Sequence, residues 1–405
     1  AINLDLKKIR NQFPIYKKFK KNNFVYLDSA STSLKHQSAI NKLNEYNESY
    51  SANVHRSVYP IAEKATNEYE KTRLKVSEFI NSKENEIIFT KNTTESINLV
   101  AYSWGLNNLK KGDKILITEM EHHSNIIPWQ HISKKTGCSL DYIKICEDGT
   151  LNLDDFEKKI LNNVKLVSII HQSNVTGIIN DIKKIIDISH INGAKVLIDA
   201  AQSVSHIKTD VKKLNCDFLV FSGHKMFAST GVGILYGKEN ILENMDPFLF
   251  GGQMINIVER QSSTYNDIPH KFEAGTPNIS EVISLGASID FLNEIGFQNI
   301  KKHMSALTKS YLDFLNYFPG IKIYGKQDNR GPVISFNIKN IHAYDFCQIM
   351  GQYNISMRAG NHCAQPLLNE FGTDSAIRIS FHIYNTIDEI NYFEDRIKKT
   401  TEILI

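Results

Sequence analysis

The chain has 405 residues, which is more than one ordinary hydrophobic core accommodates, so we expect two domains. Hydrophobic residues make up 41% of the chain and charged residues 22%, and a net charge of only +3 gives no reason to expect a nucleic-acid partner. No apolar run reaches the ~18 residues that a membrane-spanning helix requires, and the first residues lack the apolar core of a secretory signal.

Short apolar runs alternate with amphipathic stretches between residues 85 and 240. The apolar runs predict strands, and the stretches in which apolar residues recur with helical spacing predict helices. Strands are expected at 86–90, 114–118, 140–145, 165–170, 195–198, 218–221 and 233–236, and helices at 95–104, 153–162, 182–191 and 202–207. This alternation predicts an α/β fold, with a mostly parallel seven-stranded sheet and helices on both faces.

The pattern changes toward the C-terminus. Helices are expected at 281–294, 300–318, 343–353 and 387–402, with a short strand at 333–337. The mixture predicts a smaller α+β domain. We therefore expect an N-terminal segment (1–20) that packs with the small domain, a large domain (21–290), and a small domain (291–405) that carries the Cys363 loop.

Two polar residues follow neighbouring predicted strands, at the edge where parallel sheets bind ligands. Asp199 comes directly after 195–198, and Lys225 follows 218–221. A lysine in this place can bond covalently to an aldehyde cofactor, and a carboxylate can keep the cofactor's ring nitrogen protonated. Alone, Lys225 would be interpreted as an exposed loop lysine, and Asp199 would fit a helix N-cap as well as a functional role. Together they predict a pyridoxal-phosphate site.

A phosphate group needs its own set of donors. Thr93 and Thr94 stand at the start of a predicted helix, whose free N–H groups and positive dipole end suit an anion. Ser222 and His224, just before Lys225, can complete the phosphate site.

His122 and Asn174 also follow predicted strands. The histidine can stack on the cofactor ring, and the asparagine can form a hydrogen bond with the ring hydroxyl. The pair His122-His123 does not predict a metal site, because adjacent side chains on extended backbone point in opposite directions and no third ligand has a usable spacing.

The five cysteines are scattered and odd in number, which argues against a disulfide framework and for a reducing compartment. We expect the bacterial cytoplasm, or an organelle matrix or stroma if a transit peptide was removed. Cys363 stands between Gly360 and Pro366 in a polar loop, and this setting favours a reactive thiol over a buried structural one.

With these residues in place, the sequence resembles the class V, fold-type I pyridoxal-phosphate enzymes, and among them the SUF-type, selenocysteine lyase-like cysteine desulfurases. The resemblance covers nearly the whole chain. Its most specific stretches are Val54-His55-Arg56, Asn92-Thr93-Thr94-Glu95, Met120-Glu121-His122-His123, Phe221-Ser222-Gly223-His224-Lys225, Phe272-Glu273-Ala274-Gly275-Thr276-Pro277-Asn278 and Arg358-Ala359-Gly360-Asn361-His362-Cys363-Ala364. Asn361 departs from the pattern, since many relatives carry histidine there.

The resemblance implies a role for each residue. Lys225 would bind the cofactor covalently, with Asp199 and Gln202 on the ring and His122 stacked on it as a proton shuttle. Thr276 would reach the phosphate from a partner subunit, which implies a homodimer. The resemblance further implies that the substrate is bound by Arg378, Arg358 and His55.

The resemblance also implies the reaction. L-cysteine would become L-alanine, and its sulfur would pass to Cys363 as a persulfide and then to a SUF-type acceptor protein for iron–sulfur cluster assembly. The short segment from Arg358 to Cys363 implies a constrained cysteine that depends on this acceptor.

Two alternatives stay open. The same cofactor would also serve a selenocysteine lyase, an aminotransferase or a kynureninase-like enzyme, none of which needs Cys363. A non-catalytic scaffold with this fold would have lost at least one cofactor-binding group. The complete set of Lys225, Asp199, His122 and the threonines disfavours a scaffold.

Overall fold

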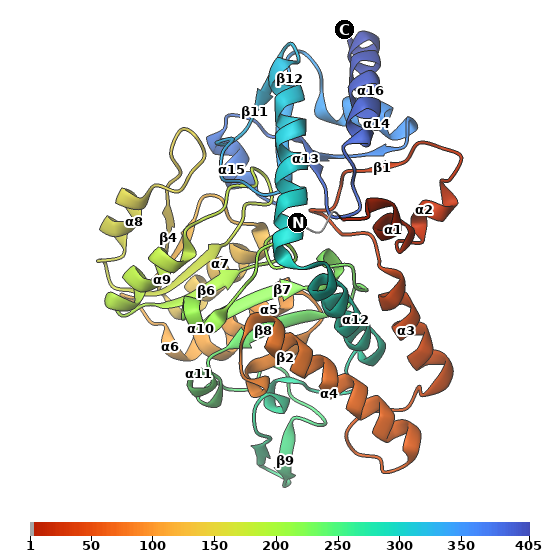
Figure 1. Cartoon of the computed structure of the whole chain (residues 1–405). Helices are drawn as coiled ribbons and strands as arrows, with labels where there is room; N and C mark the ends of the chain where they lie inside the picture. The colour runs from red at the N-terminus through yellow and green to blue at the C-terminus, as the bar shows by residue number, and fades with distance from the viewer. Residues whose placement is uncertain (1–3) are drawn as a thin grey trace.

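The structure is a computed structural model that describes residues 4–405. It contains a seven-stranded sheet and a four-stranded sheet, joined through two consecutive helices, α12 (Ile279–Ile295) and α13 (Phe297–Tyr317). In Figure 1 the larger sheet lies at the lower left, and α13 rises from α12 toward the smaller sheet at the top. This arrangement belongs to the α/β class that the sequence predicts.

The larger sheet has the order β2-β8-β7-β6-β5-β3-β4. Only β8 is antiparallel to its neighbours, so the prediction of a mostly parallel seven-stranded sheet is confirmed. The strands are rich in β-branched and aromatic residues, and their central positions are buried because helices cover both faces. Their bounds are β2 Ile87–Thr90, β3 Lys114–Thr118, β4 Ser139–Ile143, β5 Val164–Ile170, β6 Lys195–Asp199, β7 Phe218–Ser222 and β8 Gly233–Gly237.

Helices that precede, connect and follow these strands in the sequence cover the sheet (Figure 1). Buried α12 is apolar around most of its circumference, as expected for a helix with neighbours on all sides, and it packs against α3 and α4. The patterns considered above do not predict α3, α4 or α7. The helices of this region are α3 Gln37–Ser49, α4 Pro60–Ile80, α5 Thr93–Val100, α6 Leu106–Asn108, α7 Ile127–Thr136, α8 Leu153–Lys159, α9 Ile182–Ile191, α10 Val211–Leu214 and α11 Glu239–Glu243.

The predicted helix at 202–207 is wrong. The segment forms consecutive hydrogen-bonded turns instead. Its polar side chains bind distant partners: Gln202 donates to the main-chain oxygen of Ala30, and Ser205 bonds to the ring of His382. These non-local hydrogen bonds fix the segment in a shape that helical spacing in the sequence does not reveal.

The smaller sheet is antiparallel throughout, with the order β11-β12-β15-β14. The predicted strand at 333–337 and the predicted helices of this region are confirmed to within a few residues at each end. The bounds are β11 Ile321–Ile323, β12 Val333–Ile338, β14 Arg358–Gly360, β15 Ala376–Ser380, α14 Ala343–Gln352, α15 Gln365–Glu370 and α16 Asp388–Leu404.

The N-terminal segment contains α1 (Leu6–Asn11) and α2 (Ile15–Lys18). Arg10 Nη1 donates to the main-chain oxygen of Tyr384 at 2.6 Å, and Phe13 is fully buried with its ring against Tyr384. Next in the chain, β1 (Val25–Tyr26) pairs with β13 (Ile355–Ser356). The start of the chain thus contacts its last quarter, while the domain boundaries at 20 and 290 stay predictions.

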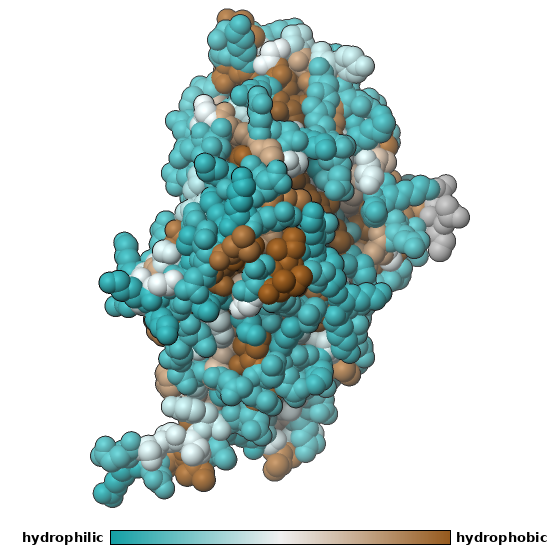
Figure 2. All heavy atoms as spheres, turned by 90° about the vertical axis from the view of Figure 1, so that its left-hand side faces the viewer, coloured by the Kyte–Doolittle hydropathy of each residue, from teal (hydrophilic) through white to brown (hydrophobic). Residues whose placement is uncertain are grey.

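The surface is mostly hydrophilic, with some hydrophobic groups gathered near the middle of the face in Figure 2. A hairpin of β9 (Ile255–Val258) and β10 (Ser263–Tyr265) projects from the bottom of the molecule in Figure 1. Phe250, Ile257 and Val258, in and beside this hairpin, are more than half exposed. Among residues 4–405, no helix is both long and apolar enough to cross a membrane.

Candidate active site

A cavity of about 210 Å³ opens at the carboxyl ends of the central parallel strands β5, β6 and β7. Its lining includes every predicted cofactor-binding residue except Thr276. The lining residues are Ser31, Asn92, Thr93, Thr94, His122, Ser124, Ile170, Asn174, Asp199, Ala201, Gln202, Ser222, His224 and Lys225. Polar strand ends far apart in the sequence therefore meet at one edge of the sheet.

Asp199 and Lys225 lie on adjacent elements of this edge. Asp199 ends β6, which pairs with β7, and Lys225 follows β7 in a single 3₁₀ turn. Asp199 is 2% exposed, and burial raises the pKa of its carboxyl group. Burial also lowers the pKa of Lys225 to about 8, against the opposing effect of the Asp199 charge. The cavity thus contains a buried carboxylate and an amine that loses its proton more readily than usual.

The N-terminus of α5 forms another wall of the cavity. The Thr93 N–H donates to Ser222 Oγ at 2.9 Å, and the hydroxyls of these two residues are 2.6 Å apart. Asn92 caps the helix by accepting from the Glu95 N–H. Gly233 of β8 packs so closely on Asn92 that a Cβ there would lie 2.5 Å from its backbone. The close packing fixes a helix start with hydroxyls around it, a suitable site for a phosphate group.

His122 lines the cavity as a neutral ring. Its Nδ1 accepts a hydrogen bond from the Ser124 N–H at 3.0 Å, which assigns the ring proton to Nε2. Burial, assisted by the positive charge of Lys225, lowers the pKa of His122 to about 3. An uncharged imidazole is the form that stacks on an aromatic ring and can accept or donate a proton there.

Glu121 precedes His122 and is fully buried. Its carboxyl oxygens accept hydrogen bonds from Thr118 and Asn125, and Asn125 in turn accepts from Trp129. Burial raises the pKa of Glu121 to about 8, so the group is protonated at neutral pH. This network fixes the backbone that carries His122.

Two arginines converge on one carboxylate beside the cavity. Arg358 and Arg378 are directly paired across β14 and β15. Both guanidinium groups contact Asp28, Arg358 at 3.0 Å and Arg378 at 3.5 Å, and Arg378 also donates to the main-chain oxygen of Asn174 at 3.1 Å. Arg378 is 3% exposed, and its Nε has no hydrogen-bond partner in the described part of the chain. The pair offers donors that suit a second carboxylate, that of a substrate.

Cys363 is exposed on the short loop between β14 and α15. Its main-chain oxygen accepts from the His123 N–H at 2.6 Å, and its N–H donates to Asn361 Oδ1 at 2.9 Å. His362 and Cys363 both adopt positive φ angles of about 54° and 53°, which non-glycine residues rarely do. These hydrogen bonds and the positive φ angles therefore hold the loop in a turned conformation.

Cys363 does not line the cavity, but its charge reaches the residues around it. Burial is the largest effect on Lys225 and Arg378 and lowers both pKa values. A negative charge on Cys363 partly opposes this shift at both residues. The thiol therefore lies near the cavity and the arginine pair at the same time.

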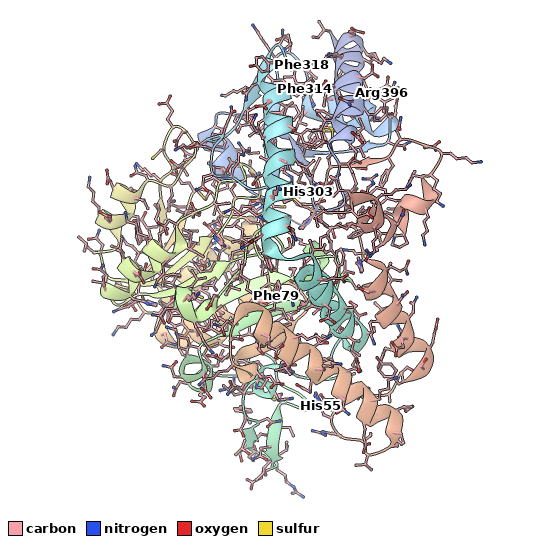
Figure 3. All side chains as sticks on the ribbon, viewed as in Figure 1. His55, Phe79, His303, Phe314, Phe318 and Arg396 are labelled. Atoms are coloured by element: carbon pink, nitrogen blue, oxygen red, sulfur yellow. The ribbon has the colours of Figure 1, made fainter. Side chains whose placement is uncertain are left out.

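Two predicted site residues lie outside the cavity of this chain. Thr276 is exposed on the loop before α12, where its hydroxyl accepts from Asn53. His55 lies beside α4 (Figure 3), and its Nε2 is 2.8 Å from Glu70 Oε1. His270 approaches the same oxygen at 3.3 Å. The roles of Thr276 and His55 stay predictions.

The group of His55, Glu70 and His270 brings its ligand atoms within 4.8 Å of one another, a spacing that could hold a metal ion. However, Arg73 Nε contacts the same Glu70 carboxylate at 2.8 Å. Its positive charge disfavours a cation at this position, so we interpret the group as a hydrogen-bonded cluster.

Sequence reasoning assigned no role to three residues of the site. Asp28 joins the two arginines, Asn92 caps α5, and His123 contacts the Cys363 loop through both its N–H and its ring, where Nε2 accepts from the Gln365 N–H at 3.1 Å. Asn92 and His123 lie in motifs that carried the resemblance. The partners of Asp28 and His123 are distant in the sequence, so only the fold reveals them.

The residues of the cavity fit pyridoxal phosphate. Lys225 provides an amine, Asp199 a buried carboxylate for the ring nitrogen, and the start of α5 with Ser222 a phosphate site. Asn174 Oδ1 is buried without a hydrogen-bond partner in the described residues, and its position on the cavity wall leaves it free for the ring.

Comparison with known proteins agrees with this fit. The family model for class-V aminotransferases matches residues 25–393. A probable cysteine desulfurase of Halalkalibacterium halodurans is 48% identical over 93% of each chain, and a cysteine desulfurase of Haloferax volcanii is 41% identical over 94% of this chain and 90% of the other.

Solved structures give the same result. An apo cysteine desulfurase from Thermococcus onnurineus superposes with a TM-score of 0.94 at 37% identity, covering 100% of this chain and 99% of that one. The Escherichia coli cysteine desulfurase CsdA, in an S-sulfonic acid form, gives 0.93 at 33% identity over the full length of both. The chain therefore belongs to the class-V aminotransferase family of pyridoxal-phosphate enzymes, and within it to the cysteine desulfurase group. Its cofactor is pyridoxal phosphate.

Proposed function

We propose that this enzyme converts L-cysteine to L-alanine and receives the sulfur on Cys363 as a persulfide. The observation that carries the proposal concerns Asn174. Asn174 lines the cofactor cavity, accepts from Arg378 through its main-chain oxygen, and donates through Nδ2 to the main-chain oxygen of His362 at 2.7 Å. One residue thus connects the cofactor cavity, the arginine for a substrate carboxylate and the loop of the thiol.

Each part of the site has a task in this reaction. When bound, pyridoxal phosphate withdraws electrons from the amino acid's Cα and makes its proton acidic. Lys225, whose pKa burial lowers to about 8, takes this proton. Arg378 holds the substrate carboxylate, and His122 holds or moves a proton in the cavity. Cofactor contacts are assigned to Thr93, Thr94, Ser222 and His224 for the phosphate, and to Asp199, Asn174 and Gln202 for the ring.

Sulfur transfer then needs the thiolate of Cys363, because a thiolate is a far better nucleophile than a thiol. An S–S bond forms between Cys363 Sγ and the substrate sulfur while the substrate Cβ–S bond breaks. The electron pair stays with Cβ, which takes up a proton and leaves as part of alanine. The described residues contain no disulfide, and a free Cys363 suits a reducing compartment.

We further propose that an acceptor protein, of the SUF type that the sequence resembles, collects the sulfur. Hydrogen bonds from His123 and Asn174 pin the Cys363 loop, so the thiol has little freedom to swing toward a distant acceptor. Because Cys363 is exposed, the acceptor can instead approach the loop. As the SUF-type resemblance implies, we propose that the acceptor delivers the sulfur to iron–sulfur cluster assembly.

A homodimer with shared active sites is part of the same proposal. Thr276 and His55 lie outside the cavity of their own chain, so they would serve the cavity of a partner chain. The exposed Phe250, Ile257 and Val258 supply apolar surface for such contact. Light scattering should give the mass of two chains, and Ile257→Asp with Val258→Asp should shift the mass toward one chain.

The first experiment assays the purified protein with L-cysteine and a reductant. The expected products are alanine and sulfide in equal amounts, with the visible absorbance of a lysine-bound cofactor beforehand. Cys363→Ala should keep the absorbance and lose sulfide release, while Cys146→Ala, which changes another exposed cysteine, should behave as the wild type. Sulfide release by Cys363→Ala at the wild-type rate would reject the role of Cys363 and favour a lyase that needs no cysteine.

A further inference from the structure

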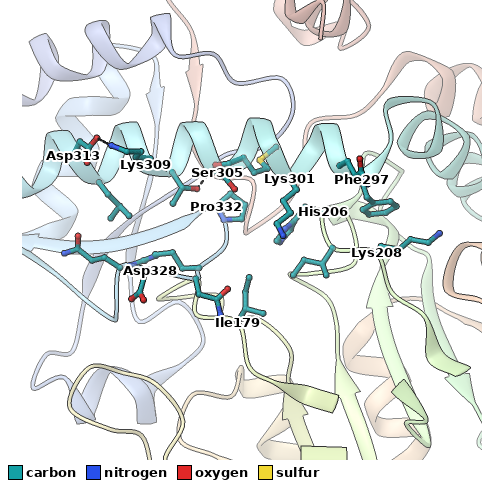
Figure 4. A pocket seen from close by; sticks show the side chains of 18 of the residues that line it. Ile179, His206, Lys208, Phe297, Lys301, Ser305, Lys309, Asp313, Asp328 and Pro332 are labelled. Atoms are coloured by element: carbon teal, nitrogen blue, oxygen red, sulfur yellow. Dashed lines mark hydrogen bonds and ion pairs between the residues drawn. The ribbon is translucent and has the colours of Figure 1, made fainter. Parts of the chain in front are cut away.

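A second, larger cavity lies between α13 and the loops that face it (Figure 4). Its volume is about 830 Å³, in the range of sites that hold drug-sized molecules. It shares no lining residue with the cofactor cavity. The walls come from α13, from the turn at 206–208 with Ile179, and from the loop at 327–332.

The charges on these walls are unbalanced. The two lining carboxylates each have a lysine partner: Asp313 pairs with Lys309 at 2.6 Å, and Asp328 pairs with Lys326 at 3.5 Å. Three further cations, Lys208, Lys301 and Arg330, also line the cavity. Within residues 4–405, none of these three has a carboxylate within 4.0 Å of its charged nitrogens. The cavity therefore has an excess of positive charge that attracts anions.

Two buried polar groups on the walls lack hydrogen-bond partners among the described residues. His206 is 7% exposed, and its Nε2 has no partner. Burial lowers the pKa of His206 to about 4, so its ring is neutral. Arg330 Nε is buried and unpartnered as well, although its other nitrogens donate to the main chain at Lys326 and Val333. A buried polar atom without a partner is costly, and a bound oxyanion would supply the missing bond at Arg330 Nε.

Six further residues of the lining are apolar. Lys208 Nζ lies 5.7 Å from the ring centre of Phe297, which keeps this cation at the edge of an apolar wall. The apolar lining residues are Ile179, Ile207, Phe297, Met304, Leu312 and Pro332. A ligand of matching chemistry has an apolar body and an anionic group.

We propose that this cavity binds a small organic anion, with its apolar body against Phe297 and Met304 and its carboxylate or phosphate among Lys208, Lys301 and Arg330. The site is independent of the cysteine desulfurase activity proposed above. Carboxylates and phosphate esters both carry negatively charged oxygens that suit these cations. The experiment below distinguishes the two classes of ligand.

The probe is the fluorescent dye 8-anilinonaphthalene-1-sulfonate, an apolar molecule with one sulfonate, titrated into the holoenzyme. We expect saturable binding of one dye per chain. Lys208→Gln with Lys301→Gln should weaken it about tenfold or more, because two of the three unpaired cations are lost. Lys302→Gln is the matched control: this exposed lysine is next to Lys301 on α13 but does not line the cavity.

A second pair of variants tests the cavity without changing charge. Ser305→Trp should fill the space from α13 and abolish binding, whereas Ala306→Trp, an exposed neighbour outside the lining, should leave it unchanged. Decanoate and adenosine monophosphate then compete with the dye. Displacement by decanoate assigns a carboxylate ligand, and displacement by the nucleotide assigns a phosphate ester. Dye binding that survives both Ser305→Trp and the double lysine variant, or that neither competitor displaces, would overturn the proposal.

Discussion

Arg358 and Arg378 face each other across β14 and β15, and both guanidinium groups lie on the carboxylate of Asp28. Their surroundings differ. Arg358 is about half exposed, with 48% of its side chain accessible, whereas the side chain of Arg378 is 4% exposed and contacts Asn174. We therefore expect buried Arg378 to be the better anchor for a substrate carboxylate, because water screens Arg358.

The first prediction separates the two arginines. Arg378→Lys keeps the charge but loses the planar fork, so KM for L-cysteine should rise about tenfold or more, in line with ~1.5–3 kcal/mol for a hydrogen bond to a charged group. Arg358→Lys should raise KM less than about threefold. Steady-state kinetics with both variants gives the comparison. An equal rise in KM for both would contradict the assignment of Arg378 as the principal anchor.

The second prediction concerns His123, a positioning residue for the Cys363 loop. His123→Ala removes the ring nitrogen that accepts from Gln365, a hydrogen bond worth ~1 kcal/mol, so kcat for sulfide release should fall about fivefold. KM and cofactor absorbance should not change, because neither Arg378 nor Lys225 is touched. His123→Gln retains a polar acceptor and should restore part of kcat. A loss of cofactor absorbance in His123→Ala would point to a general structural role instead.

The third prediction concerns the pH dependence of cofactor attachment. Only the neutral amine of Lys225 can attack the aldehyde, so the rate of attachment to the apoprotein should rise with pH up to a midpoint near 8 and then level off. Asp199→Asn should move the midpoint to lower pH, because the Asp199 charge raises the pKa of Lys225. Rapid-mixing absorbance measures both profiles. A midpoint near 10.5, the ordinary value, would show that Lys225 is not desolvated.

The fourth prediction uses Glu121, whose pKa burial raises from 4.5 to about 8. Between these two values the folded protein keeps a proton on Glu121 that the unfolded chain loses. The stabilising contribution of Glu121 is therefore complete below pH 4.5 and is lost as the pH rises to about 8. Glu121→Gln carries no such proton. Its stability relative to the wild type should therefore increase across this window, by up to about 1.4 kcal/mol per pH unit. Denaturant unfolding of the holoenzyme at several pH values tests it, and parallel curves would contradict it.

The sequence predicts the sheet and the residues at its edge well, because both signals are local. The strands are short, apolar and bounded by polar residues, and Asp199, Asn174 and Lys225 stand at their ends. Because the carboxyl ends of neighbouring parallel strands lie at one edge of the sheet, these residues can be placed together from the strand positions alone.

Contacts between distant segments could not be predicted in this way. The link from Asn174 to His362 spans 188 positions, and the pair of Asp28 with Arg358 spans 330. The same limitation explains the error at 202–207, where Ser205 bonds to His382 across 177 positions. In each case the position of a polar side chain depends on a hydrogen-bond partner far away in the sequence. Local periodicity carries no information about that partner.

The most direct test of the account is the mass of the protein after a single turnover. Holoenzyme is mixed with one equivalent of L-cysteine without reductant, digested and analysed by mass spectrometry. We expect one extra sulfur atom on the peptide that contains Cys363, removable by reductant and absent from the peptide with Cys146. Alanine formed in a full equivalent while Cys363 gains no sulfur would contradict it.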